Sequence, residues 1–497
     1  MKTSIPLIIN GKAAETSKTF DVINPATGAP FASAAAGDVS HLDAAVAAAR
    51  AAFPSWSSTA DDERQSLLHA IGDALEKNMQ ALMELVTKET GKPLNGLNGV
   101  GAGMEVGGAI AWTHATAELT LEDELIQDNE EARVEVHRKP LGVVGSITPW
   151  NWPLMIGIWH VIPALRAGNT VVIKPSSLTP VATAKFVELA NELLPPGVLN
   201  IVTATSDSGV GAAMAKHPGI NKIVFTGSTA IGRKIMQDAA GNLKRLTLEL
   251  GGNDAGIILP DVDPETVAPK LFGVGFHNNG QTCACLKRLY VHESIYEELC
   301  TELVKLAKNT IVGDGLNPET ELGPVQNKSQ LRYIEELVED ARNHDGRILC
   351  GGHAKNGAGY FFEPTIITDV TDGIRVVDEE QFGPVLPVIK YADIDDAIRR
   401  ANASPNGLGG SIWSNDLEKA AELACRLECG TAWVNEHGAI QPDAPFGGVK
   451  QSGIGVEFGR YGLEEYTSIQ TLKVMKHKGG PQLSVPPTAS AQSASGG

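Results

Sequence analysis

Short apolar runs alternate with helical patterns along the chain between Leu141 and Gly252. The runs are GVVGSI, NTVVIKP, VLNIVT, NKIVFTG and RLTLELGG, and apolar residues recur at helical spacing within residues 181–194, 209–216 and 230–239. Runs rich in β-branched residues predict strands buried on both faces, and helices between such strands make them parallel. The pattern predicts a doubly wound parallel sheet, an architecture that binds nucleotides at its carboxyl edge.

Two further regions have their own periodic patterns. Residues 43–117 are Ala-rich with apolar residues at helical spacing, as in LDAAVAAARAAF, and predict a set of helices. A second alternation of strand-like and helical segments runs from DAGIILPD to TAWVNE and predicts a second α/β domain. We therefore expect residues 1–120 and 141–251 to form one α/β domain and residues 252–451 to form another.

The segments outside these two domains have different patterns. Within residues 121–140, ARVEVHRKP alternates with period two and carries charge, which predicts a two-faced strand that reaches outside the domain. The last part of the chain, PQLSVPPTASAQSASGG, is rich in Pro, Ser and Ala and has little apolar surface to bury. We expect residues 480–497 to form a disordered tail.

Composition and charge restrict the possible partners. The 497 residues are 42% hydrophobic and 20% charged, which is ordinary for a globular protein. A net charge of −18 argues against nucleic acid or an anionic membrane, because both bind clustered Lys and Arg. No stretch approaches the ~20 apolar residues that span a bilayer, and the N-terminal apolar run is too short for a secretory signal. A small molecule is the expected ligand.

The stretch HNNGQTCACLKR holds two of the 6 cysteines, Cys283 and Cys285. A zinc site is a poor interpretation because two further ligands are needed and no matching pair lies nearby, so we predict no metal. A disulfide between residues two apart rarely meets the required geometry. The remaining alternatives are a nucleophile and a pair of small buried residues. The scattered cysteines favour free thiols in a reducing compartment, and we expect a cytoplasmic protein.

Seven motifs surround this stretch in a fixed order. They are TPWNWPL, KPSSLTP, FTGSTAIG, LELGG, NNGQTCA, EEQFGPV and PFGGVKQSGIGVEFGRYGLEEYT. Together they closely resemble the NAD(P)-dependent aldehyde dehydrogenase superfamily, from about Pro6 to Lys478. The resemblance implies a split Rossmann-like dinucleotide-binding domain, a catalytic domain at residues 252–451, and oligomerisation strands at residues 121–140 and 466–479 that form homodimers or homotetramers.

The resemblance also implies a catalytic set. Cys283 is the nucleophile, Asn151 and the Cys283 backbone N–H hold the oxyanion, and Glu249 activates water to hydrolyse the thioester. The expected reaction converts an aldehyde to the free acid with reduction of NAD(P)⁺. Cys285 is better explained by packing. Two alternatives stay open: a relative that acylates coenzyme A or phosphorylates its product, which the glutamate disfavours, and a catalytically silent structural relative.

The cofactor surface is implied by the same motifs. The chain lacks a G-x-G-x-x-G turn, and FTGSTAIG offers Gly227, Ser228 and a helix N-terminus to a pyrophosphate instead. A serine at position 177, where NAD-preferring relatives often have glutamate, leads us to expect use of both NAD and NADP. The other implied contacts are Ile147, Trp150, Lys174, Glu380 and Phe382.

The substrate wall implied by the resemblance is apolar and aromatic. It contains no evident cation or carboxylate, so we expect uncharged aldehydes, aromatic or of medium aliphatic chain length. His437 lies in a less certain loop. The wall residues are Trp152, Ile156, Trp159 and Phe446.

Overall fold

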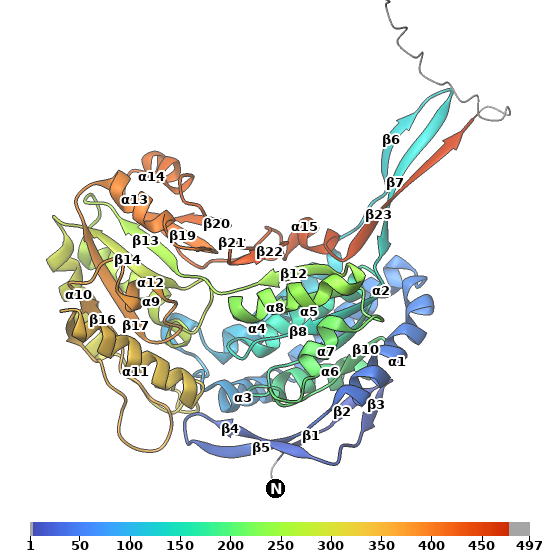
Figure 1. Cartoon of the computed structure of the whole chain (residues 1–497), viewed down its shortest axis with the longest axis horizontal. Coiled ribbons are helices and arrows are strands. Elements are labelled where there is room, and N and C mark those ends of the chain that lie inside the picture. Colours follow the sequence, from blue (N-terminus) through green and yellow to red (C-terminus); the bar gives the residue numbers. More distant parts are fainter. Residues whose placement is uncertain (1–2, 477–497) are drawn as a thin grey trace, which may run out of the picture.

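The computed structural model describes residues 3–476 of the chain. Two α/β units lie side by side, and a slender β arm projects from one of them (Figure 1). This arrangement confirms the predicted fold class. Residues 480–497, predicted to be a disordered tail, lie outside the described residues. No helix in the described part of the chain is long and apolar enough to cross a membrane.

The first unit is built on an eight-stranded sheet with the order β22-β12-β11-β8-β9-β10-β2-β3. The five central strands are parallel and match the five apolar runs, whereas β2, β3 and β22 add antiparallel edges. Most central positions are buried because helices cover both faces. The strands are β2 (Leu7–Ile9), β3 (Lys12–Ala14), β8 (Val143–Ile147), β9 (Thr170–Lys174), β10 (Leu199–Ile201), β11 (Lys222–Thr226), β12 (Arg245–Glu249) and β22 (Gly453–Ile454).

Helices predicted from apolar spacing form close to the expected bounds. The first begins at Val39, because the Asp38 side chain accepts hydrogen bonds from the Ser40 and His41 N–H groups. Helix α3 ends at Gly91, whose φ of 79° suits a glycine C-cap. The helices of this unit are α1 (Val39–Ser57), α2 (Asp61–Lys77), α3 (Met79–Thr90), η1 (Leu97–Gly99), α4 (Ala102–Glu118), α5 (Pro153–Arg166), α6 (Val181–Asn191), α7 (Val210–Lys216), α8 (Thr229–Ala239), η2 (Ala240–Asn242) and α15 (Gly459–Glu464).

The second unit has a seven-stranded sheet with the order β15-β16-β17-β14-β13-β19-β20, parallel except for β15. Its strands are β13 (Asp254–Ile258), β14 (Leu286–His292), β15 (Arg347–Cys350), β16 (Thr365–Thr368), β17 (Val385–Tyr391), β19 (Gly409–Trp413) and β20 (Thr431–Val434). Its helices are α9 (Pro264–Phe276), η3 (His277–Gly280), α10 (Tyr296–Asn309), α11 (Lys328–Asn343), α12 (Arg375–Asp378), α13 (Ile394–Asn402) and α14 (Leu417–Ala424). A short ladder joins β18 (Asn406–Gly407) to β21 (Val449–Lys450).

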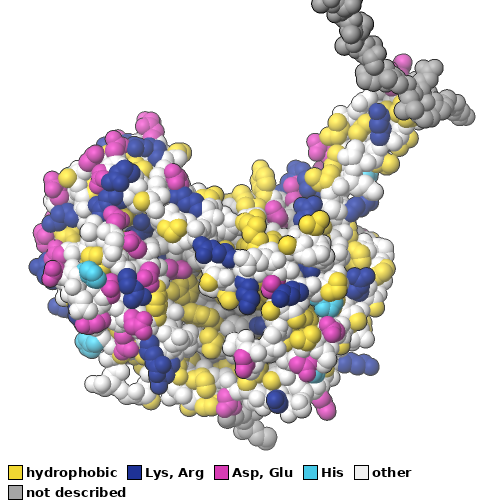
Figure 2. All heavy atoms as spheres, in the orientation of Figure 1, with side chains coloured by type: hydrophobic (Ala, Val, Ile, Leu, Met, Phe, Trp, Pro, Cys, Tyr) yellow, Lys and Arg dark blue, Asp and Glu magenta, His cyan; other side chains and the backbone are white. Residues whose placement is uncertain are grey.

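The arm is a three-stranded antiparallel sheet of β6 (Glu124–Asp128), β7 (Ala132–Pro140) and β23 (Thr467–Met475). Its strands come from the two segments that the sequence places outside the domains. Hydrophobic side chains are exposed along it (Figure 2), among them Ile126 at 57% and Ile469 at 62%. A smaller sheet at the opposite end of this unit contains β1 (Thr3–Ile5), β4 (Thr19–Asn24) and β5 (Ala29–Ala35).

Candidate active site

A cavity of about 220 Å³ lies where segments of the two units meet. The first unit contributes the segments that follow β8, β11 and β12, because the carboxyl ends of parallel strands share one sheet edge. The second unit contributes the cysteine segment, one face of α11 and the EEQFGPV segment. The lining residues are Pro149, Trp150, Asn151, Thr226, Gly227, Ser228, Leu250, Gly251, Cys283, Gln330, Tyr333, Glu380 and Phe382.

Cys283 lies in the loop between η3 and β14 and is partly exposed to the cavity. A tight turn precedes it, in which Asn278, Asn279 and Gly280 have φ values of 50°, 56° and 66°. A Cβ at position 280 would lie 2.4 Å from the Gly383 carbonyl oxygen, so only glycine fits this close approach. The turn sets the direction in which the chain carries Cys283 toward the cavity.

Cys285 has a different environment. It is 1% exposed, and its thiol donates to the Gly275 carbonyl at 3.2 Å. It does not line the cavity. These positions agree with a packing role for the second cysteine. Within residues 3–476 no cluster of three or more His, Cys, Asp or Glu side chains could hold a metal ion.

Asn151 is fixed beside the cysteine segment. Its Nδ2 donates to the Gln281 carbonyl at 3.0 Å, and its own carbonyl accepts from Lys92 Nζ at 3.1 Å and from Asn278 Nδ2 at 3.2 Å. The side chain is 4% exposed and still reaches the cavity wall. The amide is therefore held in place near the nucleophile loop before any ligand binds.

A buried ion pair supports this position from behind. Lys92 and Glu105 are bonded in the interior, and the Lys92 ammonium lies 3.2 Å from the centre of the Trp152 ring. Glu105 also accepts from the Leu154 N–H at 3.0 Å, at the start of α5. Trp152 Nε1 donates to Thr282 Oγ1 at 3.0 Å, so this residue, predicted as substrate wall, also tethers the nucleophile loop to the first unit.

Glu249 ends β12 and is 3% exposed. Neither carboxylate oxygen has a hydrogen-bond partner among the described residues. Burial and the nearby Glu457 carboxylate raise the pKa of Glu249 well above its ordinary value. The side chain does not itself line the cavity, whereas Leu250 and Gly251, which follow it, do. An unpartnered, buried carboxyl group next to the cavity is suited to exchanging a proton.

Sequence reasoning missed the polar groups behind Glu249. His160 is fully buried on α5, with Nδ1 3.0 Å from Ser146 Oγ and Nε2 3.0 Å from Thr226 Oγ1. Its Nε2 also lies 3.3 Å from Glu457 Oε1. These residues come from distant parts of the chain. The one sequence signal is the position of His160 in the apolar middle of α5.

The predicted phosphate-binding turn lines the cavity. Ser228 precedes α8 and makes no side-chain cap to that helix, so its hydroxyl and the first helical N–H groups are available to an anion. A Cβ at Gly227 would lie 2.5 Å from the Phe225 ring, so a side chain there would collide. The turn fits a phosphate group in its geometry and in its free donors.

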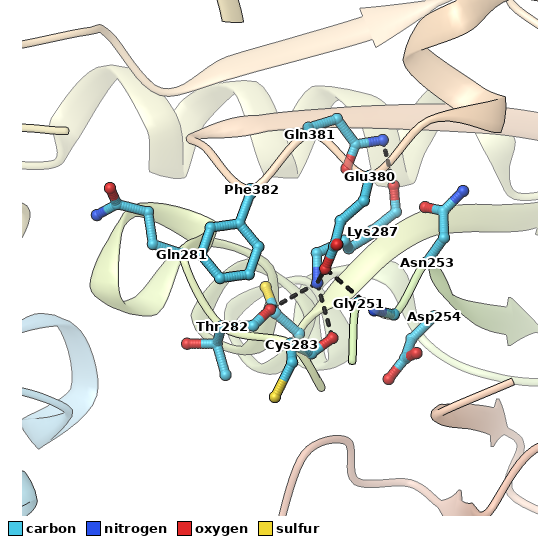
Figure 3. A network of polar contacts seen from close by, with 12 residues as sticks. Gly251, Asn253, Asp254, Gln281, Thr282, Cys283, Lys287, Glu380, Gln381 and Phe382 are labelled. Carbon is cyan, nitrogen blue, oxygen red and sulfur yellow. Dashed lines mark hydrogen bonds and ion pairs between the residues drawn. The ribbon is translucent and has the colours of Figure 1, made fainter. Parts of the chain in front are cut away.

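Glu380, Phe382 and Trp150 also line the cavity. Glu380 Oε1 accepts from the Gly252 N–H and from Lys287 Nζ, both at 3.1 Å (Figure 3). A Cβ at Gly251 would lie 2.4 Å from Glu380 Oε2, so glycine permits this contact. The Trp150 and Phe382 rings pack edge to face at 5.2 Å. A carboxylate and a pair of packed aromatic rings on the cavity wall suit a ribose and a planar ring.

The remaining predicted cofactor residues lie outside the cavity, along the same sheet edge. Ile147 ends β8 and Lys174 ends β9. Burial lowers the pKa of Lys174 to about 8, and its ammonium donates to the Pro175 carbonyl at 3.0 Å. Ser177 is partly exposed in the next turn.

The predicted substrate residues form one apolar cluster around the nucleophile. Trp159 packs edge to face on Phe458 at 4.8 Å, and Phe446 stacks on Phe458 at 6.0 Å. His437 is buried instead in the second unit, with Nδ1 2.9 Å from Ser411 Oγ. The buried cluster contains Trp152, Met155, Ile156, Trp159, Ala284, Leu408, Trp433, Phe446 and Phe458, and Val100, Trp112, Cys283 and Ile440 pack against it.

Two cavity residues on α11 had no sequence signal. Gln330 Nε2 donates to the Gln381 carbonyl at 2.9 Å and to the Phe382 carbonyl at 3.2 Å. Tyr333 donates its hydroxyl hydrogen to Glu379 Oε2 at 2.8 Å. Both residues belong to a helix whose pattern predicts only an exposed polar face and a buried apolar face.

Comparisons with known proteins agree with this geometry. The sequence model described as "Aldehyde dehydrogenase family" matches residues 12–472. This chain belongs to the aldehyde dehydrogenase family. A phenylacetaldehyde dehydrogenase from Pseudomonas fluorescens is 39% identical over 481 residues, and the match covers 93% of each chain. Retinaldehyde dehydrogenase 3 from Rattus norvegicus is 38% identical over 474 residues, covering 94% of this chain and 92% of the relative.

Solved structures show the same likeness. Betaine aldehyde dehydrogenase from Staphylococcus aureus, in complex with NAD⁺, has a TM-score of 0.92 and 34% identity, covering 97% of this chain and 96% of the other. The protein is therefore an NAD(P)-dependent aldehyde dehydrogenase that oxidises aldehydes to acids. The predicted superfamily and enzyme class are confirmed.

Proposed function

We propose that this aldehyde dehydrogenase oxidises uncharged aldehydes to free carboxylic acids through a covalent intermediate on Cys283. The observation that carries the proposal is the position of Cys283, which faces the cavity on one side and packs against the aromatic cluster on the other. A thiolate that adds to the aldehyde carbon forms a C–S bond and places the carbonyl electrons on oxygen. The Asn151 amide and the Cys283 N–H are the donors for that oxyanion.

The residues around the cavity fit a nicotinamide dinucleotide. Ser228 and the N-terminus of α8 suit the pyrophosphate, and Glu380 with Phe382 suits the nicotinamide ribose and ring. Ile147 and Trp150 contribute backbone contacts, and Lys174 reaches the adenosine ribose. When bound, the nicotinamide supplies an acceptor for the hydride that the reacting carbon releases. The Cys283 intermediate is left as a thioester.

Glu249 is the base for hydrolysis of that thioester. It would take a proton from water, which attacks the acyl carbon and releases the acid and the Cys283 thiolate. The buried, unpartnered carboxyl group supports this role, because its raised pKa makes it a stronger base than an exposed glutamate. The base also favours water over coenzyme A as the acyl acceptor, so we propose a free acid as the product.

The substrate class follows from the cluster around Cys283. Its members are apolar or aromatic, and several are nearly fully buried. Such a wall favours aromatic or medium-chain aliphatic aldehydes and disfavours a charged group, which would lose its hydration without a partner. Trp159 Nε1 has no hydrogen-bond partner among the described residues, and its N–H is free to donate to a neutral polar substituent.

We also propose that the enzyme is a homodimer or homotetramer assembled through the arm. The exposed apolar residues Leu125, Ile126 and Ile469 on its strands would be covered by a second copy. Light scattering on the purified enzyme tests this assembly, and a monomer at micromolar concentration would contradict it.

We further propose a cytoplasmic location, which the six free thiols support.

The test of the proposed reaction is a steady-state screen of aromatic, aliphatic and charged aldehydes with NAD and with NADP. We expect higher kcat/KM for uncharged aldehydes, measurable turnover with both cofactors, and equal yields of free acid and reduced cofactor without coenzyme A. A dependence on coenzyme A or phosphate would reject the hydrolytic reaction. A preference for charged aldehydes would reject the substrate class.

A further inference from the structure

Lys287 is a charged residue in the middle of the second sheet. It is the second residue of β14, a strand that is buried along almost its whole length, and its side chain is 2% exposed. An ammonium group loses its hydration in such a place and requires close partners. Its environment therefore shows which groups the charge stabilises.

Three oxygen atoms surround the ammonium (Figure 3). Lys287 Nζ donates to the Thr282 carbonyl at 2.5 Å and to the Cys283 carbonyl at 2.8 Å, and it lies 3.1 Å from Glu380 Oε1. These three contacts use all three ammonium donors. The side chain therefore joins both peptide groups that flank the nucleophile to the Glu380 carboxylate, which lines the same cavity.

The contact with Thr282 has a specific consequence. The Thr282 carbonyl and the Cys283 N–H belong to the same peptide group. A cation on the carbonyl oxygen polarises that group and makes its N–H a stronger hydrogen-bond donor. In the proposed reaction that N–H donates to the oxyanion, so the cation acts on the oxyanion without touching it.

We propose that Lys287 is a positioning residue that controls the reactivity of Cys283, and that Glu380 is its counter-charge. The ammonium orients the two peptide groups around Cys283 and favours negative charge on the nucleophile and on the oxyanion. Glu380 opposes this effect while it is bonded to Lys287. This inference deepens the proposed function, because it rests on Cys283 as the nucleophile.

The electrostatic environment of the thiol supports the inference. Burial raises the pKa of Cys283 to about 12, and Lys287 acts in the opposite direction. Glu249, Glu380 and Asp254 each raise the pKa further. Lys287 is the cation that favours the thiolate against burial and these three carboxylates.

Lys287 remains charged in this environment. Burial disfavours the ammonium, but the negative charge of Glu380, with smaller effects from Cys285, Asp254 and Cys283, raises the Lys287 pKa above its ordinary value. The ammonium therefore keeps its charge at neutral pH.

The test measures alkylation of Cys283 by iodoacetamide as a function of pH in the enzyme without cofactor, with the modified cysteine identified by peptide mass mapping. We expect Lys287→Met to slow alkylation by about tenfold at fixed pH and to move the profile upward by about one pH unit. Glu380→Gln should move it downward, because it removes the counter-charge and keeps an acceptor for the Gly252 N–H. Opposite shifts distinguish an electrostatic role from a structural one, which would slow both variants.

Two further variants complete the test. Lys287→Gln keeps donors without the charge and should behave like Lys287→Met, and Lys305→Met, at an exposed lysine on α10, should match the parent. If Lys287→Met does not fold, the comparison of Lys287→Gln with Glu380→Gln tests the same opposite shifts of the alkylation profile. Unchanged profiles, or shifts in the same direction, would overturn the inference. Failure of the parent enzyme to oxidise any aldehyde would reject the proposed function separately.

Discussion

Glu457 Oε1 lies 3.3 Å from His160 Nε2 in the interior of the first unit, behind the strand that ends at Glu249. Glu457 is 4% exposed and His160 is fully buried. After burial, the negative charge of Glu457 is the second cause of the raised Glu249 pKa. Two carboxyl groups in one buried region resist being ionised together, so Glu457 affects the pH at which the proposed base becomes active.

This relationship predicts a shift in pH dependence. Glu249 must lose its proton to act as a base, so turnover limited by hydrolysis should rise with pH. Glu457→Gln removes the like charge, lowers the Glu249 pKa, and should move the rising limb of the kcat–pH profile to lower pH. The measurement is kcat across the pH range with saturating aldehyde and cofactor. Glu188→Gln, at an exposed glutamate on α6, is the control, and a profile that moves upward would contradict the assignment.

The two cysteines should differ sharply on substitution. Cys283→Ala should reduce kcat/KM by about 10³-fold or more, because it removes the covalent step, and it should leave cofactor affinity nearly unchanged. Cys285→Ala should retain most activity and lose some stability, because its side chain is buried against Gly275. The two variants are compared by turnover for activity, by cofactor titration for affinity, and by circular dichroism for folding and stability. An active Cys283→Ala with an inactive Cys285→Ala would reverse the assignment.

Glu249→Gln should separate the two half-reactions. Steady-state turnover should fall about 100-fold or more, while a rapid burst of reduced cofactor close to the enzyme concentration remains. The burst is expected because hydride release precedes the hydrolysis for which the base is required. Stopped-flow absorbance with excess aldehyde measures it. If the variant gives no burst, Glu249 acts on the thiol and not on the hydrolytic water.

Ser177→Glu should change the choice of cofactor. A glutamate would accept hydrogen bonds from a ribose 2′-hydroxyl and repel a 2′-phosphate, whereas serine can donate to that phosphate beside Lys174. We expect the NAD-to-NADP ratio of kcat/KM to rise about tenfold or more, on the order of 1.4 kcal/mol for one charge contact in a partly exposed site. The measurement is kcat/KM with NAD and with NADP, in the parent enzyme and in the variant. An unchanged ratio would place the adenosine ribose elsewhere.

The sequence by itself determined the elements and most of the chemistry. Five apolar runs became the central strands of the first sheet, because β-branched runs separated by helical segments favour a parallel sheet covered on both faces. The motifs identified the family and singled out Cys283, Asn151, Gly227 and Ser228, which line one cavity in the structure. Local pattern was sufficient because strand ends and helix starts are properties of neighbouring residues.

The tertiary structure alone decided the contacts that tune this chemistry. Asn151 and the Gln281 carbonyl lie 130 positions apart and meet only when the two units pack together. Lys287 gains its partner Glu380 only when folding brings the two residues together, and the same holds for His160 and Glu457. The strength of a charge contact depends on distance and on exclusion of water. Both are properties of the packed interior, and local sequence patterns do not specify them.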